Sequence, residues 1–345
     1  MRHIFKKHNV ILAALLLTSA NVYSWETMPE NAPTPADNPT TPEKVTLGKM
    51  LFFDPRFSST GTVSCNSCHN VMEGGDDSRA FSMGVHGQLG GRSAPTVWNS
   101  AFHSVQFWDG RAASLEEQAK GPVVNPVEMG MSDIEKAMDR VRIIPGYKAY
   151  FDAAFSGSNT MSVDNAARAV AAYERTLITR NSPFDRYING DKKALTEQQV
   201  RGMGLFQANG CQACHSGPAF NGPAMPAGTG FYSKFPTFAD SPYTEKYDLL
   251  KDKGRADVTK SDADLYQFRV PTLRNIADTA PYFHNGSVRN LNEAVKVMAK
   301  TQLNNDISDN DAVDIAAFLV SLSGEYPEMI MPRLPPTPGT TILMD

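Results

Sequence analysis

The sequence predicts a mainly α-helical protein made of two domains. Its segments of regular hydrophobic periodicity have the helical period, and residues that favour helix starts precede several of them. The 345-residue chain is also longer than one hydrophobic core usually supports, because domains commonly hold about 100–200 residues. In addition, the pattern C-x-x-C-H occurs once in each half. We therefore expect two helical domains, over residues 25–185 and 186–326, each built around one copy of this pattern.

Residues 1–24 have the three parts of a secretory signal. These parts are the cations Arg2, Lys6 and Lys7, an apolar stretch from Val10 to Leu17, and the cleavage site Val22-Tyr23-Ser24. The apolar stretch is shorter than the roughly 20 residues that span a bilayer, which disfavours a membrane anchor. We expect a signal peptide that is removed, so that the mature chain begins near Trp25.

Seven segments are predicted to be helical. The first covers residues 42–53 and begins with Pro42, which suits the first turn of a helix. The segment 131–141 carries a capping box formed by Ser132 and Glu135. The remaining predicted helices cover residues 114–120, 164–177, 196–208, 292–300 and 309–323. One predicted helix precedes each C-x-x-C-H pattern, so the two halves repeat the same order of elements.

Segments rich in glycine, proline or asparagine are predicted to be irregular. They are an extended lead-in at 28–41, a mobile glycine-rich loop at 73–91, the junction between the domains at 181–191, a loop-dominated stretch at 218–262 and a proline-rich tail at 327–345. The glycine-rich loop contains His86. Because glycine leaves the backbone free to change conformation, this histidine stands on a segment that can move.

The two C-x-x-C-H patterns are the strongest signal of function in the chain. All 4 cysteines fall within them, as Cys65-Asn66-Ser67-Cys68-His69 and Cys211-Gln212-Ala213-Cys214-His215. This spacing is the attachment sequence of c-type haem. Two thiols on one turn reach the two vinyl groups of a porphyrin, and the next residue's imidazole lies under the iron. We therefore expect a dihaem cytochrome with two covalently bound haem c groups and the motif histidines as proximal ligands.

Two other uses of paired cysteines are disfavoured. The pairs stand much farther apart in sequence than those of zinc ribbons, and a structural zinc site does not require the histidine that follows each pair. Disulfides within C-x-x-C turns are redox pairs rather than structural links. Haem attachment alone accounts for both the cysteines and the histidines.

Charge and compartment agree with a redox protein. The chain has 33 basic and 37 acidic residues and a net charge of −4, which argues against nucleic acid as a partner. A charge this mild still allows weak electrostatic docking of another redox protein. Haem is joined to C-x-x-C-H outside the bacterial cytoplasm, so the motifs and the signal both predict the periplasm.

The group that fills the sixth position of each iron distinguishes an electron carrier from a catalyst. Outside the signal and the motifs, the histidines are His86, His103 and His284, and methionines are further candidates. His86 is either a solvent-exposed loop residue or, given the glycines around it, a detachable ligand. Met298 is either an iron ligand or a core residue on an apolar helical stripe.

Three further side chains have both a functional and a plainer interpretation. Trp108 is either a buried core residue or an electron relay. Glu128 stands in apolar company, where a raised pKa would suit an acid–base catalyst, although a surface position is commoner for glutamate. Gln118 offers only its amide as a hydrogen-bonding group. The residues alone leave these alternatives open.

Six stretches resemble the bacterial dihaem cytochrome c peroxidases, in the same order along the chain. They are Leu47-Gly48-Lys49-Met50-Leu51-Phe52-Phe53-Asp54-Pro55-Arg56, Ser64-Cys65-Asn66-Ser67-Cys68-His69-Asn70, Ala94-Pro95-Thr96-Val97, Val105-Gln106-Phe107-Trp108-Asp109-Gly110-Arg111, Phe268-Arg269-Val270 and Thr279-Ala280-Pro281-Tyr282-Phe283-His284. The resemblance spans residues 42–324. It implies two cytochrome-c-like haem domains, and reduction of hydrogen peroxide to water with electrons from a small periplasmic cytochrome c or a cupredoxin.

The resemblance also implies a division of labour between the haems. The N-terminal haem would be the low-potential peroxidatic site, with His86 as its removable sixth ligand. The C-terminal haem would receive electrons at high potential, with Met298 as its sixth ligand; related methylamine-dehydrogenase-maturation enzymes carry Tyr there. Trp108 matches the aromatic residue between the haems, and Gln118 and Glu128 match the polar pair beside bound peroxide.

The family also has a calcium ion between its domains, and here the match is incomplete. Ser93 stands where the family has an Asn ligand, so an oxygen donor is changed. The carbonyl oxygens of Thr279 and Pro281 remain as ligands in the implied site. His284 is expected to contact haem propionates rather than iron. The resemblance further implies a homodimer.

Two other functions remain open on the sequence. A pure electron carrier would keep both irons six-coordinate and would never bind peroxide. A third function is the oxidative modification of a partner protein. Mixing the half-reduced protein with peroxide and reduced cytochrome c would separate a peroxidase from a carrier.

Overall fold

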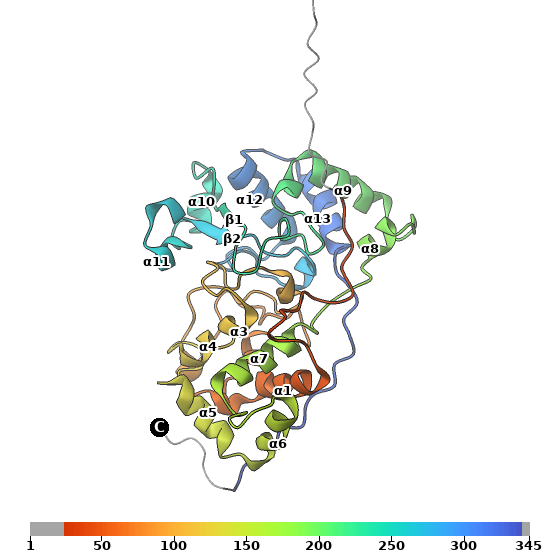
Figure 1. The fold of residues 1–345 in the computed structure, drawn as a ribbon. Coiled ribbons are helices and arrows are strands. Elements are labelled where there is room, and N and C mark those ends of the chain that lie inside the picture. Colours follow the sequence, from red (N-terminus) through yellow and green to blue (C-terminus); the bar gives the residue numbers. More distant parts are fainter. Residues whose placement is uncertain (1–23, 340–345) are drawn as a thin grey trace, which may run out of the picture.

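The computed structural model describes residues 24–339, and their architecture is mainly helical (Figure 1). The predicted signal peptide lies outside the described residues except for Ser24, and so does the end of the tail, residues 340–345. The helices are α1 (Pro42–Phe53), α2 (Cys65–Cys68), α3 (Leu115–Gln118), α4 (Gly121–Val124), α5 (Ile134–Arg142), α6 (Pro145–Ala154), α7 (Val163–Glu174), α8 (Pro183–Ile188), α9 (Glu197–Ala208), α10 (Pro242–Lys246), α11 (Ala256–Thr259), α12 (Leu291–Leu303) and α13 (Asp309–Val320). Short 3-10 turns and one antiparallel pair, β1 (Tyr232–Lys234) with β2 (Gln267–Arg269), join them.

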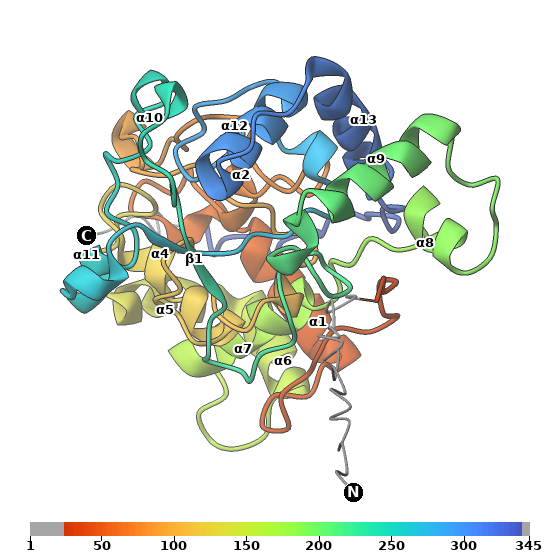
Figure 2. The same cartoon turned by 90° about the horizontal axis from the view of Figure 1, so that it is seen from above.

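Each half of the molecule is organised by one pair of crossing helices. In the first half α1 packs on α7, and in the second half α9 packs on α13 (Figure 2). A Cβ atom at Gly48 of α1 would lie 1.8 Å from the Ala169 carbonyl oxygen of α7. A Cβ atom at Gly202 of α9 would lie equally close, 1.8 Å, to the Asp314 carbonyl oxygen of α13. Only glycine permits these approaches, and the predicted repetition of a helix followed by C-x-x-C-H is confirmed.

Three clusters of buried side chains form the interior. The first half has one large core that includes Phe52, Trp98 and Phe151. The second half has an aromatic core, formed chiefly by Phe184, Phe206, Phe220 and Phe318. A smaller cluster with Phe235, Phe268 and Val297 lies beside the β1–β2 pair. Figure 1 shows the two halves as separate lobes, the first below and the second above.

The two ends of the described chain cross to the opposite halves. The Trp25 ring lies 5.6 Å from the Phe184 ring and 5.9 Å from the Phe220 ring, within the aromatic core of the second half. At the other end, Met329 and Leu334 of the proline-rich tail pack against the core of the first half. The tail runs back along the first half in Figure 1. Each core is therefore completed by the far end of the chain.

Several helix starts differ from the predicted ones because another residue caps the helix. The Asp133 carboxylate accepts a hydrogen bond from the Glu135 amide at 2.8 Å, so α5 begins at Ile134 and the predicted capping box of Ser132 is wrong. The predicted junction at 181–191 contains α8, which begins at Pro183. The sequence analysis missed α6, which likewise begins with a proline. Proline starts these helices because its fixed φ suits the first turn.

The predicted irregular segments are largely irregular in the structure. Residues 73–91 contain only a 3-10 turn, Val85–Gly87, and the stretch 218–262 contains β1, α10 and α11 between loops. The predicted helices at 42–53, 196–208 and 309–323 correspond to α1, α9 and α13. Within residues 24–339, no helix has both the length and the apolar character needed to cross a membrane.

Candidate functional site

The first C-x-x-C-H motif lines a cavity of about 340 Å³ in the first half. Cys65, Cys68 and His69 reach this cavity from α2 and the residue that follows it. Gln118 reaches it from the end of α3, and Glu128 from the loop after α4. The structure thus brings the first motif and the predicted polar pair together around one space, which we call the first cavity.

The His69 ring is oriented by the backbone. Its Nδ1 atom lies 2.9 Å from the Pro95 carbonyl oxygen. A carbonyl only accepts hydrogen bonds, so Nδ1 carries the proton and Nε2 keeps its lone pair. Burial lowers the pKa of His69, which favours the neutral ring. A neutral imidazole held in this tautomer is the form that coordinates a metal.

Glu128 is a half-buried acid in the wall of the first cavity. Its Oε1 atom accepts a hydrogen bond from Asn125 Nδ2 at 2.8 Å. Burial raises the pKa of Glu128, although the Arg111 charge and the Asn125 hydrogen bond oppose the rise. A carboxyl that holds its proton more readily than usual is suited to both accepting and donating a proton near neutral pH.

His86 is not part of the cavity wall. It is exposed at the tip of a small hairpin, where its φ of +57° lies in the left-handed region. The hairpin closes through a hydrogen bond of 2.8 Å from the Gly84 amide to the Gln88 carbonyl, and the Val85 amide binds the Glu128 carbonyl at the same distance, 2.8 Å. The structure therefore ties the hairpin to Glu128 but leaves the His86 ring outside the first cavity.

The second motif lines a separate cavity of about 230 Å³, which we call the second cavity. Cys211, Cys214 and His215 contribute to its wall, and Met298 reaches it from α12. His215 Nδ1 lies 3.0 Å from the Phe220 carbonyl oxygen, so its Nε2 is again left with a lone pair. Burial lowers the pKa of His215. The structure brings this histidine and Met298 to one space, as the resemblance implies.

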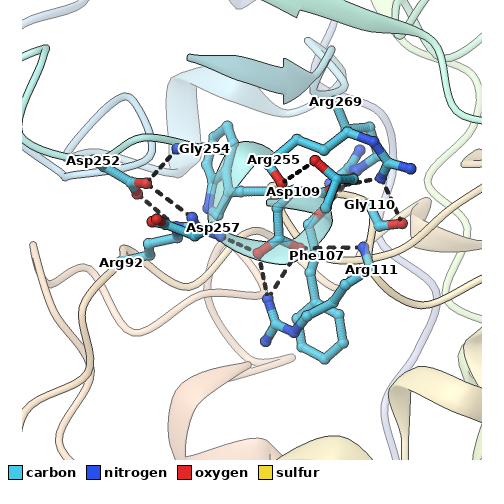
Figure 3. Close-up of polar contacts among 12 residues, drawn as sticks. Arg92, Phe107, Asp109, Gly110, Arg111, Asp252, Gly254, Arg255, Asp257 and Arg269 are labelled. Atoms are coloured by element: carbon cyan, nitrogen blue, oxygen red, sulfur yellow. Dashed lines mark hydrogen bonds and ion pairs between the residues drawn. The ribbon is translucent and has the colours of Figure 1, made fainter. Parts of the chain in front are cut away.

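The two cavities share one wall, formed by residues 93–96 and Trp108. The Trp108 Nε1 atom donates a hydrogen bond to the Ser93 carbonyl at 2.9 Å. Its ring lies 6.4 Å from the His284 ring, measured between centroids, and His284 lines the second cavity. Trp108 therefore stands between the two motif-lined spaces. Its neighbours Phe107, Asp109 and Gly110 lie among several arginines (Figure 3).

Two polar residues of the second cavity, Arg269 and His103, make a contact that the sequence did not predict. Arg269 is 4% exposed, and its guanidinium bonds to the Phe107 carbonyl and the His103 ring rather than to a carboxylate. Burial lowers the pKa of Arg269 to about 10. His103 also accepts a hydrogen bond from Asn221 Nδ2, at 2.9 Å from its Nδ1. A buried cation that faces a cavity without a carboxylate is suited to an acidic group of a ligand.

Glu174 is a second acid of the first cavity that the sequence analysis missed. It ends α7 and is 5% exposed, and its carboxyl accepts no hydrogen bond from any described residue. Burial raises its pKa to about 8. The only feature of the sequence that could have identified Glu174 is its position after a run of alanines and a tyrosine. A single acid at the end of such an apolar stretch has no obvious partner.

A zinc site shared by the two cysteine pairs does not fit the structure, because the pairs line different cavities. Residues 24–339 contain no group of three or more His, Cys, Asp and Glu side chains that could hold a metal ion. Thr279 and Pro281, the two residues of the predicted calcium site, line the second cavity. The Ser93 hydroxyl donates a hydrogen bond to the Arg79 carbonyl at 3.3 Å. A site built from carbonyl oxygens stays a prediction.

The residues of both cavities fit a haem. Each cavity offers two thiols on one turn and an imidazole whose Nδ1 binds a backbone carbonyl, so that Nε2 is the atom that would bind iron. The second cavity adds the Met298 sulfur and the Arg269 guanidinium, which suits an acidic haem propionate. Iron ligands and an anion partner are thus present where a porphyrin needs them.

Comparison with known proteins gives a consistent result. Residues 42–193 match the family described as di-haem cytochrome c peroxidase. The cytochrome c551 peroxidase of Nitrosomonas europaea is 43% identical over 309 residues, covering 90% of this chain and 88% of that protein. The cytochrome c551 peroxidase of Pseudomonas aeruginosa is 44% identical over 316 residues, covering 91% and 88%.

More distant relatives extend the likeness. The methylamine utilization protein MauG of Methylophilus methylotrophus is 33% identical over 352 residues, covering 97% of this chain and 99% of that protein. The crystal structure of a MauG-like protein associated with microbial copper homeostasis is 29% identical with a TM-score of 0.74, covering 88% of this chain and 96% of that one.

The fold and the two cavities define a mainly helical redox protein with two haem cofactors. The chain belongs to the di-haem cytochrome c peroxidase family. It is an oxidoreductase that acts on peroxide and takes electrons from a redox partner.

Proposed function

We propose that this protein reduces hydrogen peroxide to water in the periplasm, with electrons from a small cytochrome c or a cupredoxin. One observation carries the proposal. The two cavities share the Trp108 wall, but a carboxyl and an amide that can handle peroxide, Glu128 and Gln118, line only the first. Among the described residues of the second cavity there is no carboxylate. This asymmetry suits one reactive centre and one electron store.

The cysteines and histidines of the motifs would hold the two haems. The thiols of Cys65 and Cys68, and those of the second motif, would form thioethers with the haem vinyl groups. The Nε2 atoms of His69 and His215 would bind the irons. Bound haem supplies an iron that exchanges single electrons and that can bind peroxide where its sixth position is open.

Side chains of the first cavity would transfer the protons of the reaction. Reduction of one hydrogen peroxide to two water molecules consumes two electrons and two protons. The raised pKa of Glu128 suits it to take a proton from one peroxide oxygen and return it to the other, which then leaves as water. Gln118 would orient peroxide through its amide.

The two cavities would differ in the sixth ligand of the iron as well as in their acidic side chains. A methionine ligand raises the potential of a haem, so Met298 suits the second cavity to the role of electron acceptor. In the first cavity, His86 would be a removable ligand, and its exposed position outside the wall supports a form in which that cavity is free for peroxide. The methionine also favours a peroxidase over a MauG-like enzyme.

We predict that Glu128→Gln lowers kcat for peroxide, because the amide can neither accept nor return a proton. The expected loss is about 100-fold to 10,000-fold in a steady-state assay that follows oxidation of reduced cytochrome c. Glu117→Gln is the matched control, since Glu117 is an exposed residue of α3 outside the first cavity. Equal activity of the two variants would remove Glu128 from the mechanism, and a wild-type protein without turnover would favour the electron-carrier alternative.

Three further expectations accompany this function. The signal-like residues 1–24 support export, and a purified protein that begins near Trp25 would establish it. The Thr279 and Pro281 carbonyl oxygens are the proposed calcium ligands, checked by equilibrium binding of calcium alone. A homodimer is expected from the family resemblance, and sedimentation would measure it.

A further inference from the structure

The turn that carries Trp108, residues 107–110, belongs to the first half by sequence but is held by the second half (Figure 3). Arg269 binds it twice. Its Nε atom donates to the Phe107 carbonyl at 3.1 Å, and its backbone amide donates to the Trp108 carbonyl at 2.8 Å. Because Arg269 belongs to β2, the first two carbonyls of the turn are fixed to the sheet of the second half.

Arg255 binds the other two carbonyls of the same turn. Its Nη1 atom donates to the Asp109 carbonyl at 2.9 Å and lies 3.4 Å from the Gly110 carbonyl oxygen. The same nitrogen donates to the Tyr232 hydroxyl at 2.8 Å, which ties the guanidinium to β1. Every carbonyl of the turn therefore accepts a hydrogen bond from the second half.

The turn is strained, which shows that its surroundings determine its conformation. Phe107 has a φ of +67°, in the left-handed region. Such a conformation costs a bulky residue about 1–3 kcal/mol and persists only where neighbouring groups fix it. The Arg111 guanidinium, stacked 3.5 Å from the centre of the Phe107 ring, covers one face of this residue. The contacts of Arg269 and Arg111 with Phe107 account for this backbone conformation, which would be unfavourable in the unfolded chain.

Two arginines of the first half also bind the turn, and one of them is itself bound to the second half. The Arg111 Nη1 atom donates to the Asp109 carboxylate at 2.9 Å. The Arg92 Nη1 atom contacts the same carboxylate, while its Nε and Nη2 atoms contact the Asp252 carboxylate at 2.6 and 2.9 Å. The residue after Arg92, Ser93, accepts the Trp108 indole hydrogen bond. The Arg92 contact with the turn is thus anchored in the second half.

We propose that Arg255 is a positioning residue that holds the Trp108 indole in the wall between the two cavities. Arg255 lines neither cavity, so it acts only through the turn. The inference rests on the proposed function, and it takes the Trp108 indole in the shared wall as the route by which an electron crosses from the second haem to the first. The second haem gives up one electron at a time and is re-reduced by the donor, so that two electrons and two protons convert one peroxide into two water molecules at the first. A turn released from Arg255 moves the indole, and this crossing slows because electron transfer depends steeply on the gap between groups.

The test uses the protein with both haems bound and the second haem reduced by ascorbate. Stopped-flow mixing with hydrogen peroxide follows the loss of the reduced absorption band of the second haem. We expect Arg255→Gln to slow this loss by roughly tenfold or more, because small displacements of a reacting group carry large rate penalties. The midpoint potentials of both haems should stay at their wild-type values. Arg255→Lys should restore part of the rate, since an ammonium group still donates to carbonyls.

Arg201→Gln is the control variant. Arg201 is an exposed residue of α9 that pairs with Asp314 at 3.0 Å, away from the turn, and its loss should leave the crossing rate unchanged. An Arg255→Gln rate equal to that of this control would overturn the inference. So would a slowed rate accompanied by shifted potentials, because the haem sites themselves would then be disturbed. A wild-type protein whose second haem is not oxidised by peroxide would overturn the proposed function first, and with it the inference.

Discussion

Glu174 places a second titratable carboxyl in the first cavity, besides Glu128. Burial raises the Glu174 pKa from 4.5 to about 8, with Arg175 opposing the rise and Glu116 adding to it. A carboxyl whose pKa is higher in the folded than in the unfolded state binds more protons when folded. The folded state therefore loses stability as the pH rises from about 4.5 to about 8.

We predict that Glu174→Gln stabilises the protein at pH 8.5 by at least about 1 kcal/mol, and has little effect near pH 4.5. The amide removes the cost of a buried negative charge, and at low pH the wild-type carboxyl is already neutral. Thermal unfolding of both proteins at the two pH values measures the difference. Glu117→Gln, at an exposed position, should show no such dependence. A stabilisation by Glu174→Gln that is equal at both pH values would contradict the buried charge.

The residues that the sequence could identify are those whose spacing carries chemistry. Cys65, Cys68 and His69 are adjacent in the chain because one porphyrin must reach all of them, so the motif is visible without the fold. Glu174 has no such local pattern, and Arg269 is marked only by its place in the stretch Phe268-Arg269-Val270. Their importance comes from burial beside a cavity, which depends on how distant segments meet.

At the scale of elements, α9 carries two glycines with opposite surroundings. Gly202 faces the α13 backbone, where an added Cβ would lie 1.8 Å from the Asp314 carbonyl oxygen. Gly204 has no atom within 4 Å of the corresponding position. One glycine is required by the helix crossing, and the other only weakens the helix, because glycine is a poor helix former.

We predict opposite effects for alanine at these two positions. Gly202→Ala should destabilise the protein by about 1–3 kcal/mol, because α9 must move away from α13 to accommodate the methyl group. Gly204→Ala should stabilise it by about 0.5–1 kcal/mol through helix propensity alone. Denaturant unfolding of both variants provides the comparison. If both variants were destabilised by a similar amount, the close crossing of α9 and α13 would not be what distinguishes Gly202 from Gly204.

Helix positions were predictable where capping and periodicity agreed. The helices α9 and α13 are found close to their expected ranges, and the structure shows that Thr196 and Ser308 cap them. The start of α5 was misplaced because Ser132 and Asp133 are both good caps, and the sequence does not show which one the chain uses. The strands β1 and β2 have 3 residues each, too short for alternation to reveal them.

At the scale of the whole molecule, the crossing of the chain ends was not predictable. Trp25 was expected only as the start of the mature chain, ahead of the extended lead-in at 28–41, yet its ring packs among Phe184, Phe206 and Phe318 of the second half. No local pattern links residues this far apart in sequence. The expected arrangement, in which each domain is built from one continuous segment, therefore omits the exchange of terminal segments.

We predict that Trp25→Ala destabilises the protein by about 2–4 kcal/mol, because it removes a large ring from an aromatic core. Chemical denaturation, followed through an absorption change of the second haem, measures the effect where it should be greatest. Phe238→Ala is the control, since Phe238 is an aromatic residue of the second half that is 44% exposed. If the two variants unfold at the same denaturant concentration, the Trp25 ring does not stabilise the aromatic core of the second half.

The exchange of terminal segments has a consequence for separating the halves. A nick between α7 and α8 would divide the polypeptide into two fragments, and each would carry a piece that its counterpart requires. The amino-terminal fragment keeps Trp25, which nests in the other fragment's aromatic interior, while the carboxy-terminal fragment keeps Met329 and Leu334. We therefore expect the two fragments of a cleaved molecule to stay bound to each other, which size-exclusion chromatography after limited proteolysis would measure.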